Sequence, residues 1–137
     1  MTHGFEIVLT ALTVWGESKG EPYQGKLGVA FVICNRSRLW NQSVSRVVLR
    51  AWQFSFWNTG DPSRDDISDI DVHGSVWKDC MKAASAAYYE LSLDPTHRAV
   101  YYLNPDVVDP LPVWWDVDGD PSSEVRIGHH LFRRQKS

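Results

Sequence analysis

The sequence is poor in cysteine and has no long apolar run. Cysteine occurs only as Cys34 and Cys80 among 137 residues, which is too few for a disulfide scaffold and gives no metal-ligand spacing. Both cysteines lie in apolar segments, so we expect free, buried thiols, with a disulfide between them as the alternative. No apolar stretch reaches the ~20 residues that a membrane-spanning helix needs, so we expect no stable insertion into a membrane.

The chain also lacks an excess of charge of one sign and a recognisable leader. Lysine and arginine number 14 against 17 aspartates and glutamates, for a formal charge of −3. This balance argues against a nucleic-acid partner, and we interpret the basic tail HHLFRRQK as a solvated terminus. The opening MTHGFEIVLTALTVW has neither a basic leader nor a small-residue cleavage site, so we expect no secretory signal.

Apolar and aromatic residues are plentiful by comparison. A hydrophobic content of 43% with seven tryptophans is enough for a sizeable core, and the length suits one domain. We therefore expect one compact domain over residues 1–137, present as a monomer.

Hydrophobic periodicity predicts two helices at the start of the chain. Apolar residues from Phe5 to Trp15 recur at three- and four-residue steps, and Gly16 and Gly20 indicate the end of this helix. Pro22 suits the first position of a second helix. That helix runs through YQGKLGVAFVICNRSR and is apolar on nearly every side, as in a core helix. Its β-branched residues also permit a strand, but its length favours a helix.

The rest of the sequence predicts two more helices and a small β element. Ser43 caps a short helix, and Ser75 begins the longest one, whose apolar stripe runs to Leu91 before Asp94-Pro95 ends it. The run AWQFSFWNTGDPSRDD has no periodicity and indicates a loop. Two β-prone runs, RAVYYLNP and EVRIGHHLF, flank the irregular DPLPVWWDVDGDP. The expected fold class is mainly α (α+β), with a small β element near the C-terminus.

Two carboxylates, Glu17 and Glu21, lie at the break between the first two helices. At the C-terminal end of a helix the dipole disfavours the Glu17 anion, and Trp15 can desolvate it, so we expect a raised pKa that suits a general acid. Glu21 precedes Pro22, where exposed amides of the next helix stabilise an anion. The two environments push the two pKa values apart, and glycosidic bond cleavage is the commonest chemistry that requires such a pair of carboxylates. The alternative is that both are ordinary surface residues.

Aromatic residues gather in or beside the loops. An exposed aromatic face is what a sugar ring packs against, although many of these residues can equally belong to the core. They are Trp52, Phe54, Phe56, Trp57, Tyr101, Tyr102, Trp114 and Trp115.

Four motifs, in one order, resemble the SleB/CwlJ cell wall hydrolase family. The segment WGESKGEPYQGKLGVAFVICNR is similar to the family pattern YGEARGEPYxGQxAVAxVxxNR, and QFSFWN, YYLNP and IGHHLF resemble its QFS, YYNP and IGxHxF segments. Together they span the chain from about residue 5 to residue 132. One departure is Ser18-Lys19 in place of Ala-Arg, which keeps a positive charge but loses a bidentate fork.

The resemblance implies a lysozyme-like fold that acts on the glycan strands of peptidoglycan, between N-acetylmuramic acid and N-acetylglucosamine. It implies that Glu17 is the catalytic acid, and the pKa argument places Glu21 with it as a second catalytic candidate. We expect no stable partner other than these glycan strands.

Five residues of these motifs are candidates for substrate binding. Gln53 and Ser55 can hydrogen-bond acetamido groups, or serve only local backbone bonds in a loop. Tyr102 can place its hydroxyl near the catalytic acid and Asn104 can bind an N-acetyl carbonyl, or both can belong to a turn at a strand end. Trp57 offers its ring to a sugar.

Histidines invite a metal interpretation that the spacing does not support. His129 and His130 have no third ligand at a diagnostic distance along the chain, and His73 lies in an unrelated loop. We interpret them as structural or surface residues and expect neither a metal nor another cofactor.

Two reaction outcomes remain open. A lytic transglycosylase uses one glutamate as acid and then base while the muramoyl 6-hydroxyl attacks C1, whereas a hydrolytic lysozyme needs a second carboxylate. We favour the first; Glu21, Asp61, Asp65 and Asp66 keep the second open. We expect a phage endolysin that stays in the host cytoplasm until a holin admits it to the cell wall and periplasm. A non-catalytic peptidoglycan-binding or virion module is the competing class.

Overall fold

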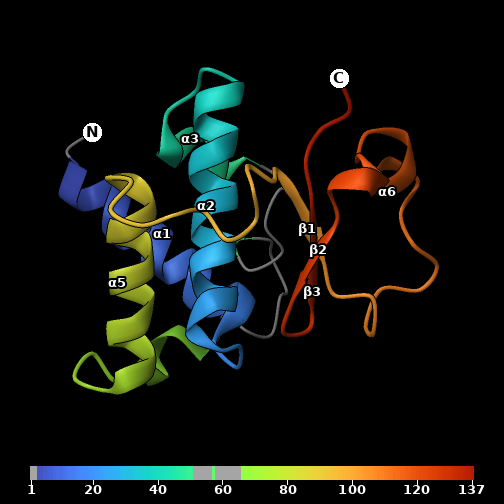
Figure 1. Cartoon of the computed structure of the whole chain (residues 1–137). Coiled ribbons are helices and arrows are strands. Elements are labelled where there is room, and N and C mark those ends of the chain that lie inside the picture. The colour runs from blue at the N-terminus through green and yellow to red at the C-terminus, as the bar shows by residue number, and fades with distance from the viewer. Residues whose placement is uncertain (1–2, 51–56, 58–65) are drawn as a thin grey trace.

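The computed structural model describes residues 3–50, 57 and 66–137. Gln53, Ser55 and most of the predicted aromatic loop therefore lie outside the described residues. The elements, shown in Figure 1, are α1 (His3–Ser18), α2 (Tyr23–Leu39), α3 (Val44–Leu49), η2 (Asp66–Asp69), α5 (Ser75–Tyr88), β1 (Tyr101–Leu103), α6 (Val113–Val117), η3 (Pro121–Ser123), β2 (Val125–Ile127) and β3 (His130–Arg133).

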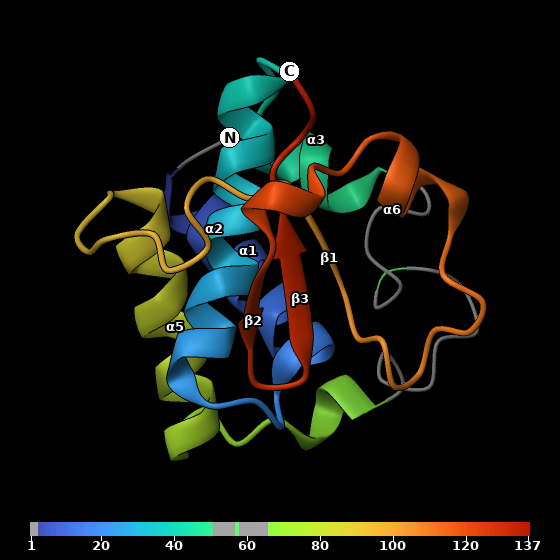
Figure 2. The same ribbon diagram turned by 45° about the vertical axis from the view of Figure 1, so that its right-hand side comes forward.

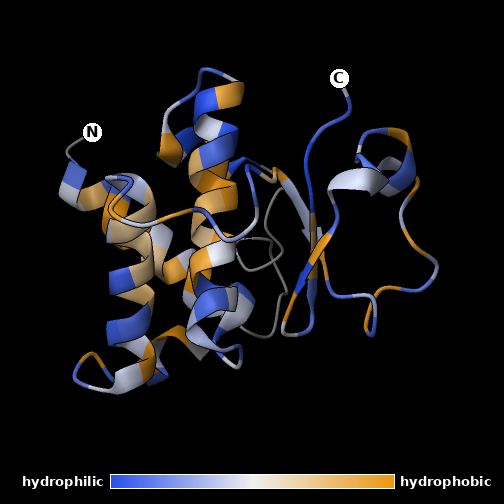
Figure 3. Cartoon of the chain, viewed as in Figure 1, coloured by the Kyte–Doolittle hydropathy of each residue, from blue (hydrophilic) through white to orange (hydrophobic). Residues whose placement is uncertain are grey.

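α1, α2, α3 and α5 form one half of the molecule, and the sheet lies in the other half together with α6 (Figure 1). α1, α2 and α5 lie side by side, and α2 is buried on nearly every side: all residues from 25 to 34 are buried. Figure 3 shows hydrophobic residues along the middle of α2. This confirms the prediction of a core helix after Pro22, which serves as its N-cap. α1 continues past Gly16 to Ser18, so Glu17 lies in its last turn.

A buried carboxylate, Glu6, ties three helices together. Its Oε2 accepts from the backbone amide of Ser45 at 2.9 Å, at the start of α3, and its Oε1 accepts from the hydroxyl of Tyr88 at 2.9 Å, at the end of α5. Burial, with the nearby Glu6 charge and hydrogen bond, raises the pKa of Tyr88 to about 12. The hydroxyl therefore stays protonated and keeps donating to Glu6.

One predicted helix boundary was wrong, and one helix was not predicted. α5 ends at Tyr88, because Glu90 adopts a positive φ of 54° and the amide of Leu91 turns back to the carbonyl of Ala86 at 2.8 Å. Leu91 is consequently 71% exposed and does not continue the apolar stripe. The region expected to be irregular contains α6, whose Trp115 is buried.

The sheet confirms the predicted β element. Its order is β1-β3-β2 with both pairs antiparallel, and Phe132 on the central strand faces Tyr102 on one side and Val125 on the other (Figure 2). Phe132 is fully buried against α2, where a Cβ on Gly28 would lie 2.9 Å from the phenyl Cζ. A glycine on α2 thus permits the close approach of sheet and helix.

A second buried carboxylate joins the turn between α1 and α2 to the β2–β3 turn. Glu21 has a side chain only 8% exposed; its Oε1 accepts from the backbone amide of His129 at 2.7 Å, and its Oε2 lies 2.7 Å from His129 Nδ1. Its own backbone carbonyl accepts from Lys26. Gly128 has a positive φ of 59°, and a Cβ there would lie 2.6 Å from Glu21 Oε1, so both backbone and space require glycine.

The charge of Glu21 depends on these contacts. Burial alone would raise its pKa, but the side-chain and backbone hydrogen bonds from His129, with the fields of His130 and His129, outweigh burial and hold the pKa below its usual value. The hydrogen bond and charge of Glu21 in turn raise the pKa of His129. The anion expected at Glu21 is therefore supported, but by the distant β2–β3 turn and not by the amides of α2 to which the sequence pointed.

The two cysteines are free and buried, as predicted. Burial raises the pKa of Cys34 to about 12 and that of Cys80 to about 11. Within the described residues, no helix combines the length and apolarity needed to cross a membrane.

The close packing of α2 on the sheet can be tested with Gly28→Ala. The new methyl would press on the ring of Phe132, which is fully buried. Overpacking costs ~1–3 kcal/mol, against a helix-propensity gain of up to ~1 kcal/mol, so we expect a net loss of unfolding free energy. Gly4→Ala in α1 is the matched control, since a Cβ there meets nothing within 4 Å. Denaturant unfolding followed by circular dichroism compares them; equal stabilities would contradict the packing described.

The contact of Glu21 with His129 predicts a pH window of stability. Because the pKa of Glu21 is lowered in the folded protein, Glu21 adds to the unfolding free energy above its ordinary pKa of 4.5, and this stability is lost as the pH falls through the folded pKa. Because the pKa of His129 is raised, His129 adds to the unfolding free energy below its ordinary pKa of 6.5, and this stability is lost as the pH rises through the folded pKa. We expect wild type to exceed Glu21→Gln in unfolding free energy most between about pH 4.5 and 6.5.

Thermal unfolding of both proteins from pH 3 to 9 measures this difference. Glu90→Gln, at an exposed glutamate, controls for the loss of a carboxylate as such and should show no comparable maximum. A wild-type advantage that stays flat across the whole pH series would show that Glu21 and His129 do not form the charged pair.

Candidate active site

A cleft of about 700 Å³ runs between the two halves of the molecule. It is bounded by the end of α1, the C-terminal part of α2, β1 with the segment that follows it, α6 and the start of β3. The described residues that line it are Glu17, Arg36, Trp40, Arg50, Tyr101, Tyr102, Leu103, Asn104, Val107, Val108, Pro112, Trp114, Asp118 and His130. Three of the sequence-predicted site residues, Glu17, Tyr102 and Asn104, are therefore brought together.

Glu17 is half-buried in the cleft and is hydrogen-bonded to Tyr102. Burial, the charge of Glu17 and this hydrogen bond raise the pKa of Tyr102 well above 10. The tyrosine hydroxyl thus remains protonated and donates to the carboxylate. The predicted proximity of Tyr102 to Glu17 is present in the structure, across a helix end and a strand that are far apart in the sequence.

Arg36 is a cleft residue that the sequence analysis missed. It is 5% exposed, its Nε donates to the carbonyl of Val100 at 2.7 Å, and its guanidinium lies 5.5 Å from the ring centroid of Trp40. Burial lowers the pKa of Arg36, while the charges of nearby groups, Glu17 among them, oppose that shift. A clue was present in the sequence, because an arginine in a helix that is apolar all round needs buried partners.

Neighbouring groups act on Glu17 in opposite directions. The positive charge of Arg36 and the hydroxyl of Tyr102 favour the carboxylate. The C-terminal end of α1 favours the neutral acid. A carboxyl under such opposed influences is suited to giving up and taking back a proton.

The cleft walls offer polar and aromatic contacts for a ligand. Asn104 uses its Oδ1 to accept from the amide of Asp106 at 2.9 Å, which leaves Nδ2 as the donor for a ligand carbonyl. Trp114 is 39% exposed, and its ring centroid lies 5.6 Å from that of Tyr101. Trp57 is held on α1, where its Nε1 donates to Thr13 Oγ1 at 2.7 Å, so a sugar contact by Trp57 stays a prediction.

The structure separates the two glutamates of the predicted pair. Glu21 is not among the described residues that line the cleft; its Oε1 lies 3.5 Å from Nδ1 of His130, and the His130 ring lines the cleft instead. Both histidines were interpreted as satisfied structural or surface residues; His130 is buried, but its Nδ1 has no hydrogen-bond partner among the described residues, so it is not fully satisfied. His129 is exposed and pairs with Glu21.

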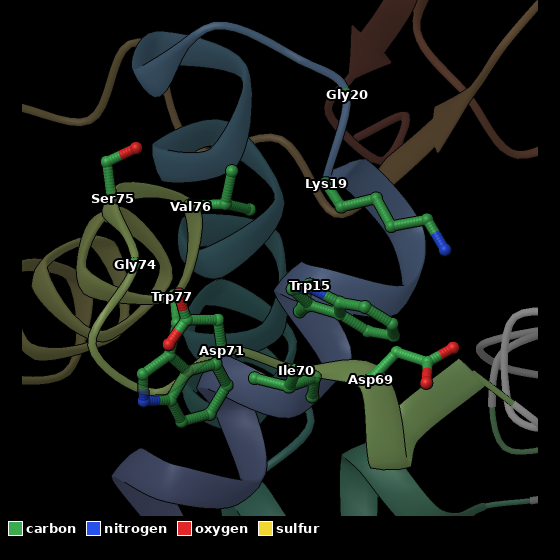
Figure 4. A pocket seen from close by; sticks show the side chains of 10 residues that line it. All are labelled: Trp15, Lys19, Gly20, Asp69, Ile70, Asp71, Gly74, Ser75, Val76 and Trp77. Carbon is green, nitrogen blue, oxygen red and sulfur yellow. The ribbon is translucent and has the colours of Figure 1, made fainter.

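A second hollow of about 440 Å³ lies between the end of α1, η2 and the start of α5 (Figure 4). Trp15 and Trp77 contribute aromatic surface and Asp69 contributes a carboxylate. The ammonium of Lys19 lies 4.3 Å from the Trp15 ring centroid. Trp15 and Lys19 share one face of α1 by their four-residue spacing, whereas Glu17 points to the opposite face, so this hollow is separate from the cleft.

Among the residues that the structure describes, no cluster of three or more histidine, cysteine or acidic side chains forms a metal site. The expectation of metal-free chemistry stays a prediction.

Comparison with known proteins adds independent information. A family model described as Cell Wall Hydrolase matches residues 20–133, beginning just after Glu17. The chain is 32% identical over 131 residues to the spore cortex-lytic enzyme of Bacillus subtilis (strain 168), with 93% of this chain and 37% of that protein covered. It is 33% identical over 129 residues to that of Bacillus cereus, with 93% and 43% covered. The chain thus spans about two fifths of the length of these relatives.

Two solved structures share the architecture. The catalytic domain of the germination-specific lytic transglycosylase SleB from Bacillus anthracis has a TM-score of 0.69 at 28% identity, covering 98% of this chain and 97% of that one. The catalytic domain of the Bacillus cereus SleB protein has a TM-score of 0.67 at 30% identity, covering 98% and 93%. The fold is therefore lysozyme-like, and, with a family model that matches most of its length, the chain belongs to the cell wall hydrolase family.

Proposed function

We propose that this protein cleaves the glycan strands of peptidoglycan between N-acetylmuramic acid and N-acetylglucosamine, as a lytic transglycosylase. The observation that carries the proposal is Glu17, half-buried in a cleft of about 700 Å³ with Tyr102 hydrogen-bonded to its carboxyl group. Family membership and the likeness to a SleB domain described as a lytic transglycosylase support the same chemistry.

In the proposed reaction Glu17 begins as the neutral acid. It gives its proton to the glycosidic oxygen, the bond from that oxygen to C1 breaks, and N-acetylglucosamine leaves with a free 4-hydroxyl. The 6-hydroxyl of the muramoyl residue then attacks C1 and loses its proton to the Glu17 carboxylate, which restores the acid. Tyr102 and Arg36 stabilise Glu17 while it is charged, between these two proton transfers.

The hydrolytic alternative needs a second carboxylate that can activate water. Asp118 is the other acidic residue along the described cleft, and its charge acts on Tyr101. Asp61 and Asp65 lie outside the described residues. Because hydrolysis and transglycosylation break the same bond, the products distinguish them.

The biological setting stays a prediction. An endolysin held in the host cytoplasm was expected from the sequence, whereas the curated relatives are spore cortex-lytic enzymes. A turbidity assay on permeabilised vegetative cells and on decoated spores compares the two substrates directly.

One prediction of the proposed function concerns the products. We expect digestion of purified peptidoglycan to release muropeptides that end in 1,6-anhydromuramic acid, because the 6-hydroxyl replaces water as nucleophile. Mass spectrometry detects them as lighter by one water than the hydrolytic products. Only reducing-end N-acetylmuramic acid would identify a lysozyme, and new amino termini without glycan cleavage would refute the proposed glycan specificity.

Another prediction of the proposed function concerns the catalytic acid. Glu17→Gln keeps the size of the side chain but is unable to transfer the proton, so turnover should fall by ~10²–10⁴-fold with the fold intact. Glu90→Gln, at an exposed glutamate away from the cleft, is the matched control and should keep wild-type turnover. If Glu17→Gln stays active while a folded Glu21→Gln is inactive, the catalytic role belongs to Glu21.

A further inference from the structure

His130 has a buried ring nitrogen whose state is set by one neighbour. Its side chain is 8% exposed, and Nδ1 lies 3.5 Å from Glu21 Oε1 without forming a hydrogen bond to any described group. Its ring meets that of Tyr102 edge-to-face at 5.2 Å and lines the same cleft as Glu17. Neither the acid chemistry of Glu17 nor the packing of the sheet requires a histidine here.

The carboxylate of Glu21 determines which nitrogen carries the proton. An ionised carboxylate only accepts hydrogen bonds. A lone pair on Nδ1 would face an oxygen lone pair in a buried place, whereas a proton on Nδ1 faces an acceptor. The neutral ring is therefore the Nδ1–H tautomer, and Nε2 is left as an acceptor on the edge of the ring turned from Glu21.

Neutrality of the ring follows from its surroundings. His129 pairs with Glu21 at the surface, and the hydrogen bond and charge of Glu21 raise the pKa of His129. Burial lowers the pKa of His130, outweighing the opposite effect of Glu21, and His129 adds to the lowering. The positive charge is therefore favoured on His129 beside the carboxylate, and the neutral form is favoured at His130 in the cleft.

The cleft suits a neutral ligand that carries hydroxyl groups. Its described wall carries two acidic residues, Glu17 and Asp118, and two basic residues, Arg36 and Arg50, so neither kind predominates. Asn104 supplies a donor and Tyr101 with Trp114 supplies aromatic surface. A further acceptor, at His130, completes the contacts that a sugar needs.

We propose that His130 is a substrate-binding residue whose Nε2 accepts a hydrogen bond from a sugar hydroxyl in the cleft, and that Glu21 is the positioning residue that holds it in the required tautomer. The identity of the ligand as a glycan rests on the proposed function. Glu21 thereby acts on the substrate through His130, which gives the second glutamate a role distinct from proton transfer at the glycosidic bond.

Two substitutions of His130 distinguish the roles of its two ring nitrogens. His130→Asn keeps a donor near Nδ1 but removes the acceptor, and His130→Gln places an amide oxygen near the position of Nε2. For peptide-free glycan strands we expect His130→Asn to lower kcat/KM roughly 3- to 10-fold, the range of one neutral hydrogen bond, mainly through KM. His130→Gln should stay within about twofold of wild type. His97→Asn, in an exposed turn before β1, controls for the exchange itself.

A spectroscopic measurement covers the case in which His130→Asn does not fold. Long-range ¹H–¹⁵N spectra of the Glu17→Gln protein should show His130 protonated at Nδ1, with the Nε2 resonance moving when peptide-free glycan strands are added. In a protein that also carries Glu21→Gln, the Nε2–H tautomer should become populated. The proposal would be overturned if His130 is the Nε2–H tautomer while Glu21 is present. It would also be overturned if the Nε2 resonance does not shift when glycan strands bind.

The kinetic outcomes are equally decisive. Folded His130→Asn with wild-type kcat/KM, or His130→Gln as impaired as His130→Asn, would remove His130 from the binding site. A wild-type protein that releases no glycan product would instead refute the proposed function, and the tautomer found by NMR would stand independently of that result.

Discussion

The buried carboxylate of Glu21 is the contact on which the arrangement of the cleft depends. It receives both its hydrogen bonds from His129, 108 positions further along the chain. Glu17 precedes it at the end of α1, and His130 follows His129 at the start of β3. One ion therefore sets the distance between the helical wall that carries the acid and the strand wall that faces it, and a buried ion fixes geometry because separating it from its partner leaves a charge unpaired.

The helical half uses the same device at Glu6. There the carboxylate holds the start of α3 and the end of α5 against α1, so both ends of α1 are fixed by acidic side chains. The core between them is apolar, and the hydrophobic interactions that hold it together are non-directional. In this molecule hydrophobic burial brings the elements together, and the two glutamates specify how they are oriented.

Local patterns were enough to predict α1, α2, α3 and the start of α5. Most of what they missed depends on contacts between residues far apart in the sequence. The periodicity of α1 and the all-round apolarity of α2 are properties of consecutive residues, and they also place Glu17 in a terminal turn. The partner of Glu21 and the burial of Arg36 depend on segments that meet only in the folded chain. α6 was not predicted because it has only five residues and the segments on either side of it are rich in proline and aspartate; the burial of Trp115 against other parts of the fold stabilises it.

The register of β3 has a consequence for how this family member can vary. His130 and Phe132 lie two positions apart and share one face of the strand, toward the cleft and α2, while Arg133 stacks on Trp115 from the other face. Strand side chains alternate, so a shift of one residue exchanges the two faces. Inserting or deleting a single residue in the turn at Gly128 would move the imidazole out of the cleft and an aliphatic side chain into it. Evolution can therefore change the chemistry of this hairpin far more easily than its length.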